Sequence, residues 1–538
     1  MMNLLQLFNF RQCQDRSNPF DFWNACPWLA RISVFVLGGI LTFAFSPISY
    51  PFIAIISVSP IFIVLREVKD TRSAFWVGWW FAFGCYTASM YWISFSFGVD
   101  LQAFAWLIPF TVFGLPAYFA LFPGLAAALA YITARDKPLW WLALSFALLW
   151  SIMEYARGIA LTGFPWSLLG YIWSDTPIIM QLASVVGAYG ISFFTILWIS
   201  IPFVLLYRKG WRFVSNQIFA LLALITLILT ISYGIGRLNQ DATGVIPNVK
   251  LRLVQPNIPQ KLKMDRSRIL EIYEILLALS QLPGKESITH VIWPEAALSV
   301  NLIDDEIARE HVARAAPKDG YLLLGALRRE GEGNNLKIYN SFFILDAMGN
   351  IRAIYDKSHL VPFGEYVPLR FLLPKDFKKL TLGSVDFSEG TGVQSIAVPG
   401  APLVSPLICY EGIFPGYVMP EEKKRPEWLL NITNDAWFGN TFGPYQHLAI
   451  TQSRAIEEGV PLIRVANTGI SAVVDPYGRV LTHLPLNERG VLDVLLPKKL
   501  EFRTFYSLFG NLLLPFLILC YGILVFARLW SNRRNQGE

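Results

Sequence analysis

The stretch that decides the fold of this 538-residue chain is Val-Ser-Pro-Leu-Ile-Cys-Tyr-Glu-Gly, residues 404–412. An apolar, strand-like run ends at Cys409, and a turn begins at the residues that follow it. In α/β proteins, active sites lie where strands end. Helix starts near such turns also offer unpaired N–H groups and a positive dipole end, and both favour a thiolate.

Two other charged residues occupy the same kind of position. Glu295 follows the apolar stretch Val-Ile-Trp-Pro at 291–294, and Lys357 follows the strand-like stretch 351–355. If the three strands belong to one sheet, the carboxylate, the ammonium and the thiol converge at one edge of it. In that case all three side chains would lie at a single sheet edge.

The rest of the region 240–506 alternates between strand-like and helical patterns. Such a mixture favours an α/β layered sandwich. The predicted strands are 249–254, 290–293, 321–326, 340–346, 351–355, 402–410, 428–433, 462–466 and 471–475, and the predicted helices are 266–282, 304–315 and 444–458.

The composition places this sandwich in a membrane protein. Hydrophobic residues make up 54% of the chain and charged residues only 16%, whereas soluble proteins have about 25% charged residues. Most of the charge lies between residues 240 and 506, so a soluble insert is flanked by apolar segments. The net charge of +6 does not indicate nucleic-acid binding, because much of the positive excess lies in short loops between apolar spans.

Eight apolar stretches are long enough to cross a bilayer, which takes about 20 residues. They divide the chain into an N-terminal membrane domain with seven spans (1–239), the soluble domain (240–506), and a final span with its tail (507–538). The predicted spans are 31–46, 49–65, 73–95, 101–134, 138–156, 177–207, 212–235 and 508–527.

The short loops predict the orientation, since Lys and Arg favour the cytoplasmic side. One set of loops and the C-terminal tail carry eleven basic residues, whereas the alternate loops carry only Arg157. Both termini are therefore expected in the cytoplasm and residues 240–506 outside, in the periplasm of a bacterium with two membranes. The eleven are Arg66, Lys69, Arg72, Arg135, Lys137, Arg208, Lys209, Arg212, Arg528, Arg533 and Arg534.

Cys409 has no disulfide partner in the exported domain. Of the other four cysteines, Cys13 and Cys26 are predicted in the cytoplasm, and Cys85 and Cys520 in spans. Taken singly, Cys409 could be a buried apolar residue, Glu295 a helix N-terminal carboxylate and Lys357 a solvated loop residue. Together they make an acyl-transfer apparatus of nucleophile, proton acceptor and oxyanion partner.

Four motifs resemble the nitrilase, or carbon–nitrogen hydrolase, superfamily: W-P-E (293–295), D-K-S-H-L-V-P-F-G-E-Y-V-P (356–368), C-Y-E (409–411) and N-D-A-W-F-G (434–439). The resemblance implies an αββα sandwich with a Glu–Lys–Cys triad. With eight spans and G-F-P-W (163–166) in an outward loop, the chain as a whole resembles the bacterial apolipoprotein N-acyltransferases.

This resemblance implies roles for individual residues. Glu295 is the expected general base, Lys357 the oxyanion partner, Cys409 the nucleophile and Glu365 a second supporting glutamate. The positions matching the family's acyl site are Tyr410, Glu411 and Trp437, with Met264 standing where the family often has Trp.

The implied reaction moves an acyl chain from a phospholipid, expected to be phosphatidylethanolamine, to the α-amine of a diacylated apolipoprotein. The thioester would form on Cys409, with no cofactor. The five histidines show no pair at metal-ligand spacing, and no phosphate loop or dinucleotide fingerprint occurs. His359 would be the base in a Cys–His protease, but its place in a matched motif favours a structural role.

Two other functions stay open at this point. A membrane-tethered amidase would use the same triad with water as the acceptor. A transporter would need a charge inside the membrane, for which Glu154 is the candidate. The transporter hypothesis leaves the four motifs unexplained, and an amidase does not need eight spans.

Overall fold

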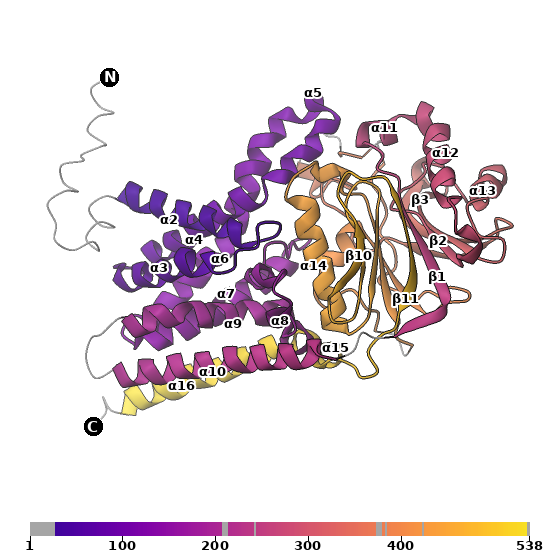
Figure 1. Ribbon diagram of the computed structural model, residues 1–538. Helices are drawn as coiled ribbons and strands as arrows, with labels where there is room; N and C mark the ends of the chain where they lie inside the picture. The colour runs from indigo at the N-terminus through magenta and orange to yellow at the C-terminus, as the bar shows by residue number, and fades with distance from the viewer. Residues whose placement is uncertain are drawn as a thin grey trace, which may run out of the picture.

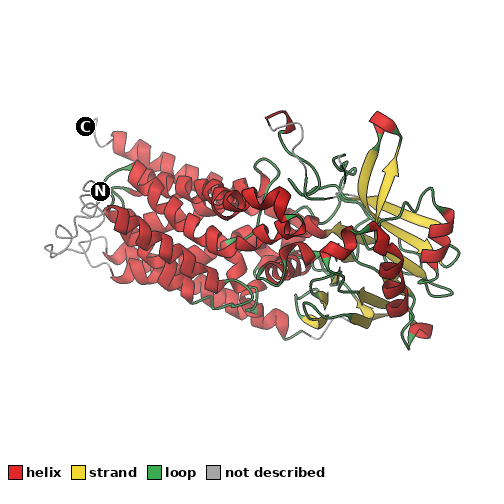
Figure 2. Ribbon diagram, turned by 90° about the horizontal axis from the view of Figure 1, so that it is seen from above, coloured by secondary structure: helices red, strands yellow, loops and turns green. Residues whose placement is uncertain are grey.

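The computed structural model describes residues 27–206, 213–240, 244–372, 379–381, 383, 385–421 and 424–534. A helix bundle and a pair of β-sheets lie end to end, as the two perpendicular views show (Figures 1 and 2). The first residues of α10 and the last residues of α16 lie at the end of the bundle remote from the sheets (Figure 1). Cys13, Cys26 and the basic loop 208–212 lie outside the described residues.

The helix bundle contains every predicted span as helix, in part or in full. The helices of this part of the chain are α2 (Pro27–Leu41), α3 (Ile53–Glu67), α4 (Thr71–Ser89), α5 (Leu101–Phe104), α6 (Leu115–Ala134), α7 (Leu139–Ile159), α8 (Pro177–Met180), α9 (Ala183–Leu206) and α10 (Phe213–Leu238), joined by α15 (Phe505–Phe509) and α16 (Leu513–Arg534).

Five helical segments among the described residues are long and apolar enough to cross a membrane: Leu101–Ala134, Leu139–Ile159, Ala183–Leu206, Phe213–Leu238 and Phe505–Ile523. The other three predicted spans coincide with α2, α3 and α4. Since α2 and α3 have only 15 residues each, the count of eight stays a prediction.

Close backbone contact holds α2 against α4. A Cβ atom on Gly38 would lie 1.8 Å from the Phe81 carbonyl oxygen, and one on Gly84 would lie 2.0 Å from the Phe35 carbonyl oxygen. Small residues at such crossings let helices approach where lipid supplies no hydrophobic driving force. The short helix α2 is therefore an integral part of the bundle.

The loops rich in Lys and Arg and the loops that alternate with them lie at opposite ends of the bundle. Arg66 Nη1 donates hydrogen bonds to the carbonyl oxygens of Arg135 (2.9 Å) and Lys137 (3.1 Å), so two basic loops meet at one end. At the other end, Ser96 Oγ donates to the Trp437 carbonyl oxygen over 3.2 Å, next to the sheets. This separation is the one that the basic-residue pattern predicts.

Eleven strands in the described part of the chain form two sheets. The six-stranded sheet has the order β11-β1-β2-β3-β4-β5, and the five-stranded sheet has the order β10-β9-β8-β7-β6. Their bounds are β1 (Val245–Gln255), β2 (His290–Ile292), β3 (Tyr321–Glu330), β4 (Lys337–Asp346), β5 (Ile351–Asp356), β6 (Val404–Ile408), β7 (Trp428–Thr433), β8 (Leu462–Ala466), β9 (Ser471–Val474), β10 (Val480–Leu484) and β11 (Gly490–Pro497).

Helices cover both outer faces of the sheet pair, which makes an αββα sandwich. The amphipathic α12 (Ile269–Ser280) and α13 (Glu306–Ala313) pack on the six-stranded sheet, and α14 (Gly443–Glu458) packs on the five-stranded one. Apolar side chains of both sheets, among them Leu253 and Ile463, form the core between them. Helix α14 thus lies between a sheet and the helix bundle (Figure 1).

All nine predicted strands are present, but the condition that the three strands before Glu295, Lys357 and Cys409 share one sheet is not met. Strands β2 and β5 belong to the six-stranded sheet, whereas β6 belongs to the five-stranded one. The runs of β2 and β6 are buried on both faces, so their periodicity carries no information about the sheet they join. The sequence pattern also missed β10 and β11, whose residues are partly exposed and only loosely alternating.

Candidate active site

The three predicted catalytic side chains lie where the two sheets face each other. Strand β5 is antiparallel to β4, β4 is antiparallel to β3, and β3 is parallel to β2. Strands β2 and β5 therefore run the same way and end at the same edge, which places Glu295 and Lys357 together. Cys409 approaches them from the opposing sheet, directly after β6.

Cys409 begins a short helical turn, η13 (Cys409–Ile413), in a conformation that favours glycine. Its φ angle is +52°, in the left-handed region, and a non-glycine residue there costs on the order of 1 kcal/mol or more. The side chain is only 8% exposed. Such strain at a strand end is common at functional sites, since it fixes the direction of one side chain.

A buried cluster of two carboxylates, an ammonium and an amide lies beside this turn. Lys357 Nζ is 3.0 Å from a Glu365 carboxylate oxygen and 3.7 Å from Glu295 Oε1. Asn340 Nδ2 donates to Glu295 Oε1 at 2.8 Å and to Glu365 Oε1 at 2.9 Å. The positive charge and the amide together stabilise two carboxylates that would otherwise repel each other.

The electrostatics of the cluster suit proton transfer from the thiol. Burial raises the pKa of Glu295, although Lys357 opposes the shift. Burial disfavours the ammonium of Lys357, but Glu365 and Glu295 outweigh it and raise the pKa of Lys357. Burial and Glu295 raise the pKa of Cys409, against the effect of Lys357. The resting thiol is therefore protonated and needs a base, and a raised pKa makes Glu295 a stronger one.

Glu411 ties the Cys409 turn to the loop that follows β5. Its Oε2 accepts from the Ile408 N–H at 2.7 Å. Its Oε1 accepts from the N–H (2.7 Å) and hydroxyl (2.8 Å) of Ser358, from the His359 N–H (3.2 Å) and from the Tyr355 hydroxyl (2.7 Å). The side chain is buried, so Glu411 joins the two sheets at the site.

The loop carrying G-F-P-W lies against the same turn. Tyr410 donates from its hydroxyl to the Gly163 carbonyl oxygen at 2.7 Å. His359 Nε2 lies 2.7 Å from the Thr162 carbonyl oxygen, and its ring stacks on Phe414 with centroids 4.0 Å apart. His359 therefore contacts the loop that follows α7, and the helix bundle reaches the candidate site.

Trp437 and Met264 are half-buried residues near the site. Trp437 belongs to η14 (Asp435–Phe438), and Met264 ends α11 (Gln260–Met264). The neighbouring Lys263 donates from Nζ to the Glu295 carbonyl oxygen at 3.1 Å, and burial lowers the pKa of Lys263 to about 8. Lys263 belongs to no predicted site residue set, although it stands next to a matched position.

Asn340 is the more important omission from the predicted site. It lies on β4, and its backbone oxygen accepts from the Lys357 N–H at 2.8 Å. The available signal was a polar pair, Asn340 and Ser341, directly before the apolar run 342–345, because a buried amide needs partners.

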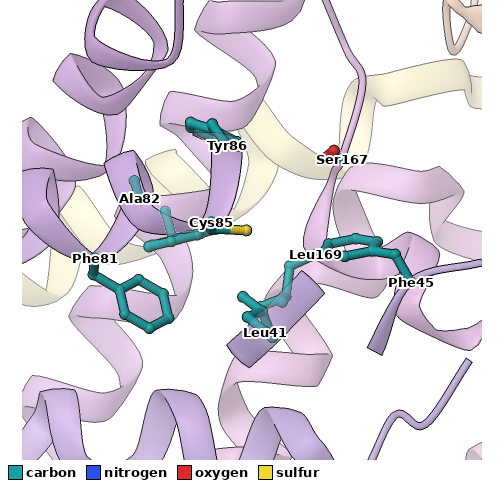
Figure 3. Close-up of a pocket in the computed structure, with 9 residues that line it drawn as sticks. Leu41, Phe45, Phe81, Ala82, Cys85, Tyr86, Ser167 and Leu169 are labelled. Carbon is teal, nitrogen blue, oxygen red and sulfur yellow. The ribbon is translucent and has the colours of Figure 1, made fainter. Parts of the chain in front are cut away.

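A small cavity in the helix bundle does not belong to this site. It is lined by Leu41, Phe45, Phe81, Cys85 and Tyr86 among others, with the Cys85 sulfur facing it (Figure 3). Its volume of about 10 Å³ is enough for one water molecule and far too small for an acyl chain.

Glu154, the transporter candidate, has structural partners. Its Oε1 accepts from Trp150 Nε1 at 2.9 Å and from the Leu169 N–H at 2.8 Å, and the residue is buried. These bonds fix α7 to the loop that follows it. Across the described ranges, no group of three or more His, Cys, Asp and Glu side chains is arranged to hold a metal ion.

Comparisons with known proteins match both parts of the chain. The carbon-nitrogen hydrolase family model matches residues 250–501, and the model of the apolipoprotein N-acyltransferase N-terminal domain matches residues 37–201. The apolipoprotein N-acyltransferase of Rhodopseudomonas palustris is 37% identical over 521 residues, which cover 93% of this chain and 95% of that one. The chain belongs to the apolipoprotein N-acyltransferase family.

Other family members are equally similar. The apolipoprotein N-acyltransferase of Rickettsia prowazekii is 37% identical, over 92% of this chain and 98% of its own length. That of Bradyrhizobium diazoefficiens is 40% identical, over 81% of this chain and 82% of its own length. Among solved structures, an amidase from Nesterenkonia sp. aligns with 47% of this chain and 92% of its own, at 21% identity and a TM-score of 0.33. Because the apolipoprotein N-acyltransferase family includes the helix bundle, membership favours acyl transfer over the amidase alternative.

Proposed function

We propose that this protein moves an acyl chain from a phospholipid to the α-amino group of an apolipoprotein's N-terminal diacylglyceryl-cysteine, through a thioester on Cys409. One observation carries the proposal: the strained Cys409 turn faces a buried carboxylate–ammonium cluster and also contacts the bundle loop at Gly163. This contact supports an acyl-transfer apparatus beside the membrane, where lipid substrates would arrive. The relatives' name supports the lipoprotein acceptor and the lipid donor.

In the first half-reaction, Glu295 takes the thiol proton as Cys409 Sγ attacks the ester carbonyl carbon of the phospholipid. The negative charge that develops on the carbonyl oxygen is stabilised by the Lys357 ammonium, which Glu365 holds in place. The C–O bond to the glycerol then breaks, and the leaving alkoxide takes the proton from Glu295. A lysophospholipid departs, and the acyl chain stays on Cys409 as a thioester.

In the second half-reaction, the α-amine of the acceptor attacks the thioester carbonyl. Glu295 takes a proton from the nitrogen, the C–S bond breaks, and the Cys409 sulfur recovers the proton. Two large lipids do not share one triad, so the kinetics are ping-pong. Water competes with the amine, and the low exposure of Cys409 (8%) limits that competition.

The proposal includes the membrane arrangement. The bundle of 1–239 and the span within 507–538 lie in the bacterial inner membrane, and 240–506 lies in the periplasm, where lipoprotein substrates are exposed. The separation of the basic loops from the loops beside the sheets supports this orientation. Phosphatidylethanolamine is the proposed donor.

The decisive experiment incubates the full-length protein with phospholipid alone. Intact-protein mass spectrometry should find one acyl chain on Cys409 and an equal amount of lysophospholipid. The adduct should be removed by hydroxylamine, discharged by a diacylated lipopeptide, and absent from Cys409→Ala. Parallel samples with phosphatidylglycerol test the donor headgroup.

Two results would contradict the proposal. Transfer to the lipopeptide without any adduct would indicate direct transfer between two bound lipids, and Cys409 would lose its role as nucleophile. Steady release of free fatty acid without an acceptor would indicate a hydrolase.

A further inference from the structure

A second polar network, which the mechanism above does not use, lies on the far side of the Cys409 turn. His447 projects from α14, is 1% exposed, and has Nε2 3.3 Å from the Cys409 carbonyl oxygen. Asn431 Nδ2, from β7, donates to the same oxygen at 3.3 Å. Two side chains from different elements therefore bind the carbonyl of the strained residue.

Buried charges fix the orientation of the His447 ring. Its Nδ1 lies 2.9 Å from Asp435 Oδ1 and 3.0 Å from Arg464 Nη2, and Arg464 Nη2 also donates to Asp435 Oδ2 at 2.7 Å. Both charged side chains are fully buried. A second guanidinium nitrogen, Arg464 Nη1, donates to Asn431 Oδ1. One arginine thus orients both groups that bind the Cys409 carbonyl.

These contacts select one form of the ring. Burial and Arg464 lower the pKa of His447, so the ring is neutral at pH 7. A neutral ring that carries its proton on Nε2 donates to the Cys409 carbonyl and accepts the Arg464 N–H at Nδ1, and it leaves only the contact of Nδ1 with Asp435 Oδ1 unsatisfied. With the proton on Nδ1 instead, the ring donates to Asp435, but its N–H faces the Arg464 N–H and an Nε2 lone pair faces a carbonyl oxygen, so the first form satisfies more of the contacts.

The network also approaches the sulfur of Cys409. Thr433 donates from its hydroxyl to Asp435 Oδ1 at 2.9 Å, and Thr433 also opposes the rise in the pKa of the Cys409 thiol. The network therefore adjoins the side chain of Cys409 as well as its carbonyl. The φ of +52° at Cys409 persists only if its surroundings hold it, and these bonds act on Cys409 itself, whereas those of Glu411 and Tyr410 act on its neighbours.

We propose that His447 is a positioning residue for the acyl-transfer reaction: by donating from Nε2 to the Cys409 carbonyl it holds the strained turn so that the sulfur faces Glu295 and Lys357. The inference rests on the proposed function, because it assumes that Cys409 is the nucleophile. It assigns a purpose to the buried Asp435–Arg464 pair, which keeps the His447 ring in the required orientation.

Two substitutions of His447 separate this role from general packing. Gln places an amide N–H near the position of Nε2 and keeps the bond to Cys409, whereas the shorter Asn places its amide near Nδ1 and keeps only the Asp435–Arg464 side. Both are polar and uncharged. The measurement is the single-turnover rate of acyl loading onto Cys409 as a function of phospholipid concentration.

His447→Gln should load within about 5-fold of the wild-type rate, and His447→Asn should load about 100-fold more slowly, since small misplacements of a reacting group cost about this factor. The half-saturating phospholipid concentration should change less than about 3-fold in both, because the lipid does not touch His447. The matched control is His290→Asn. His290 is equally buried and its Nε2 lies 3.0 Å from the Pro399 carbonyl oxygen, so its loss tests a comparable bond away from Cys409.

Equal rates for His447→Gln and His447→Asn would overturn the inference, and so would an equal effect of His290→Asn. If His447→Asn is not recovered as a folded monodisperse protein, Asn431→Asp provides the second test. This substitution removes the other donor to the Cys409 carbonyl but keeps an acceptor for Arg464. It should slow acyl loading at an unchanged half-saturating phospholipid concentration. An unchanged loading rate would refute the positioning role. Failure of the wild-type protein to load would contradict the proposed function itself.

Discussion

Asn340 donates a hydrogen bond from Nδ2 to Oε1 of Glu295 over 2.8 Å, from the strand two places along the six-stranded sheet. The same nitrogen bonds Glu365 at 2.9 Å, so one amide holds two buried carboxylates at a fixed separation. Hydrogen bonds to a carboxylate favour its ionised form, and that form is the one that accepts the thiol proton. Asn340 therefore keeps Glu295 ready to act as a base.

Replacing Asn340 with Leu should raise the pKa of Glu295 further, because the buried carboxylate would lose a hydrogen bond that stabilises its ionised form. Acyl loading at pH 7 should fall by about 10-fold or more, and the acid side of its pH profile should move to higher pH. Asn335→Leu, at an exposed asparagine of the neighbouring hairpin, is the control. A lower rate with an unshifted pH profile would show that Asn340 acts through packing instead.

The pH dependence of the wild-type protein tests the role of Glu295. Burial raises the pKa of this carboxyl group above its usual range, and only its ionised form accepts a proton. Loading should therefore rise as the pH rises through that pKa and should be lost below it. In Glu295→Gln the rate should fall by about 10²–10⁴-fold, and the Glu295-dependent rise should disappear. A mutant that keeps the same rise would assign it to another group.

Glu411→Gln should lower stability as well as activity. The carboxylate accepts hydrogen bonds from several N–H and hydroxyl groups, and an amide can offer only one oxygen to them. Leaving buried donors unpaired should cost on the order of 2 kcal/mol, visible as a lower midpoint in thermal unfolding. Glu427→Gln breaks the exposed ion pair with Lys499 and should change the midpoint little. Equal effects would show that Glu411 is not the anchor that its contacts indicate.

Much of the fold could be predicted because strand ends and turns have local signatures. A strand ends just before each of the reactive residues Glu295, Lys357 and Cys409, and all three strands are present. The sheet membership of β6 could not be predicted, since a run buried on both faces fits either sheet. It depends on pairing with β7, and pairing between distant segments leaves no local trace.

The supporting residues were harder to find for the same reason. His447 lies in a helix that was predicted correctly, but its partners Asp435 and Arg464 are on other elements. Single histidines are usually structural, and nothing in the spacing to Cys409 marks this one. A buried network becomes visible only when the elements that carry its members are placed together.

The orientation of the membrane bundle can be tested independently of catalysis. Asp136 and Asn335 are both exposed residues, the first in a basic loop of the bundle and the second on the hairpin between β3 and β4. In a protein whose native cysteines are replaced by serine, Asp136→Cys and Asn335→Cys each carry one reactive thiol. A membrane-impermeant maleimide added to intact spheroplasts should label Asn335→Cys and spare Asp136→Cys, and detergent should expose both. The basic loops favour this result because moving Lys and Arg across the bilayer is costly. Labelling of Asp136→Cys alone would place residues 240–506 in the cytoplasm, away from exported lipoproteins, and would remove the proposed acceptor.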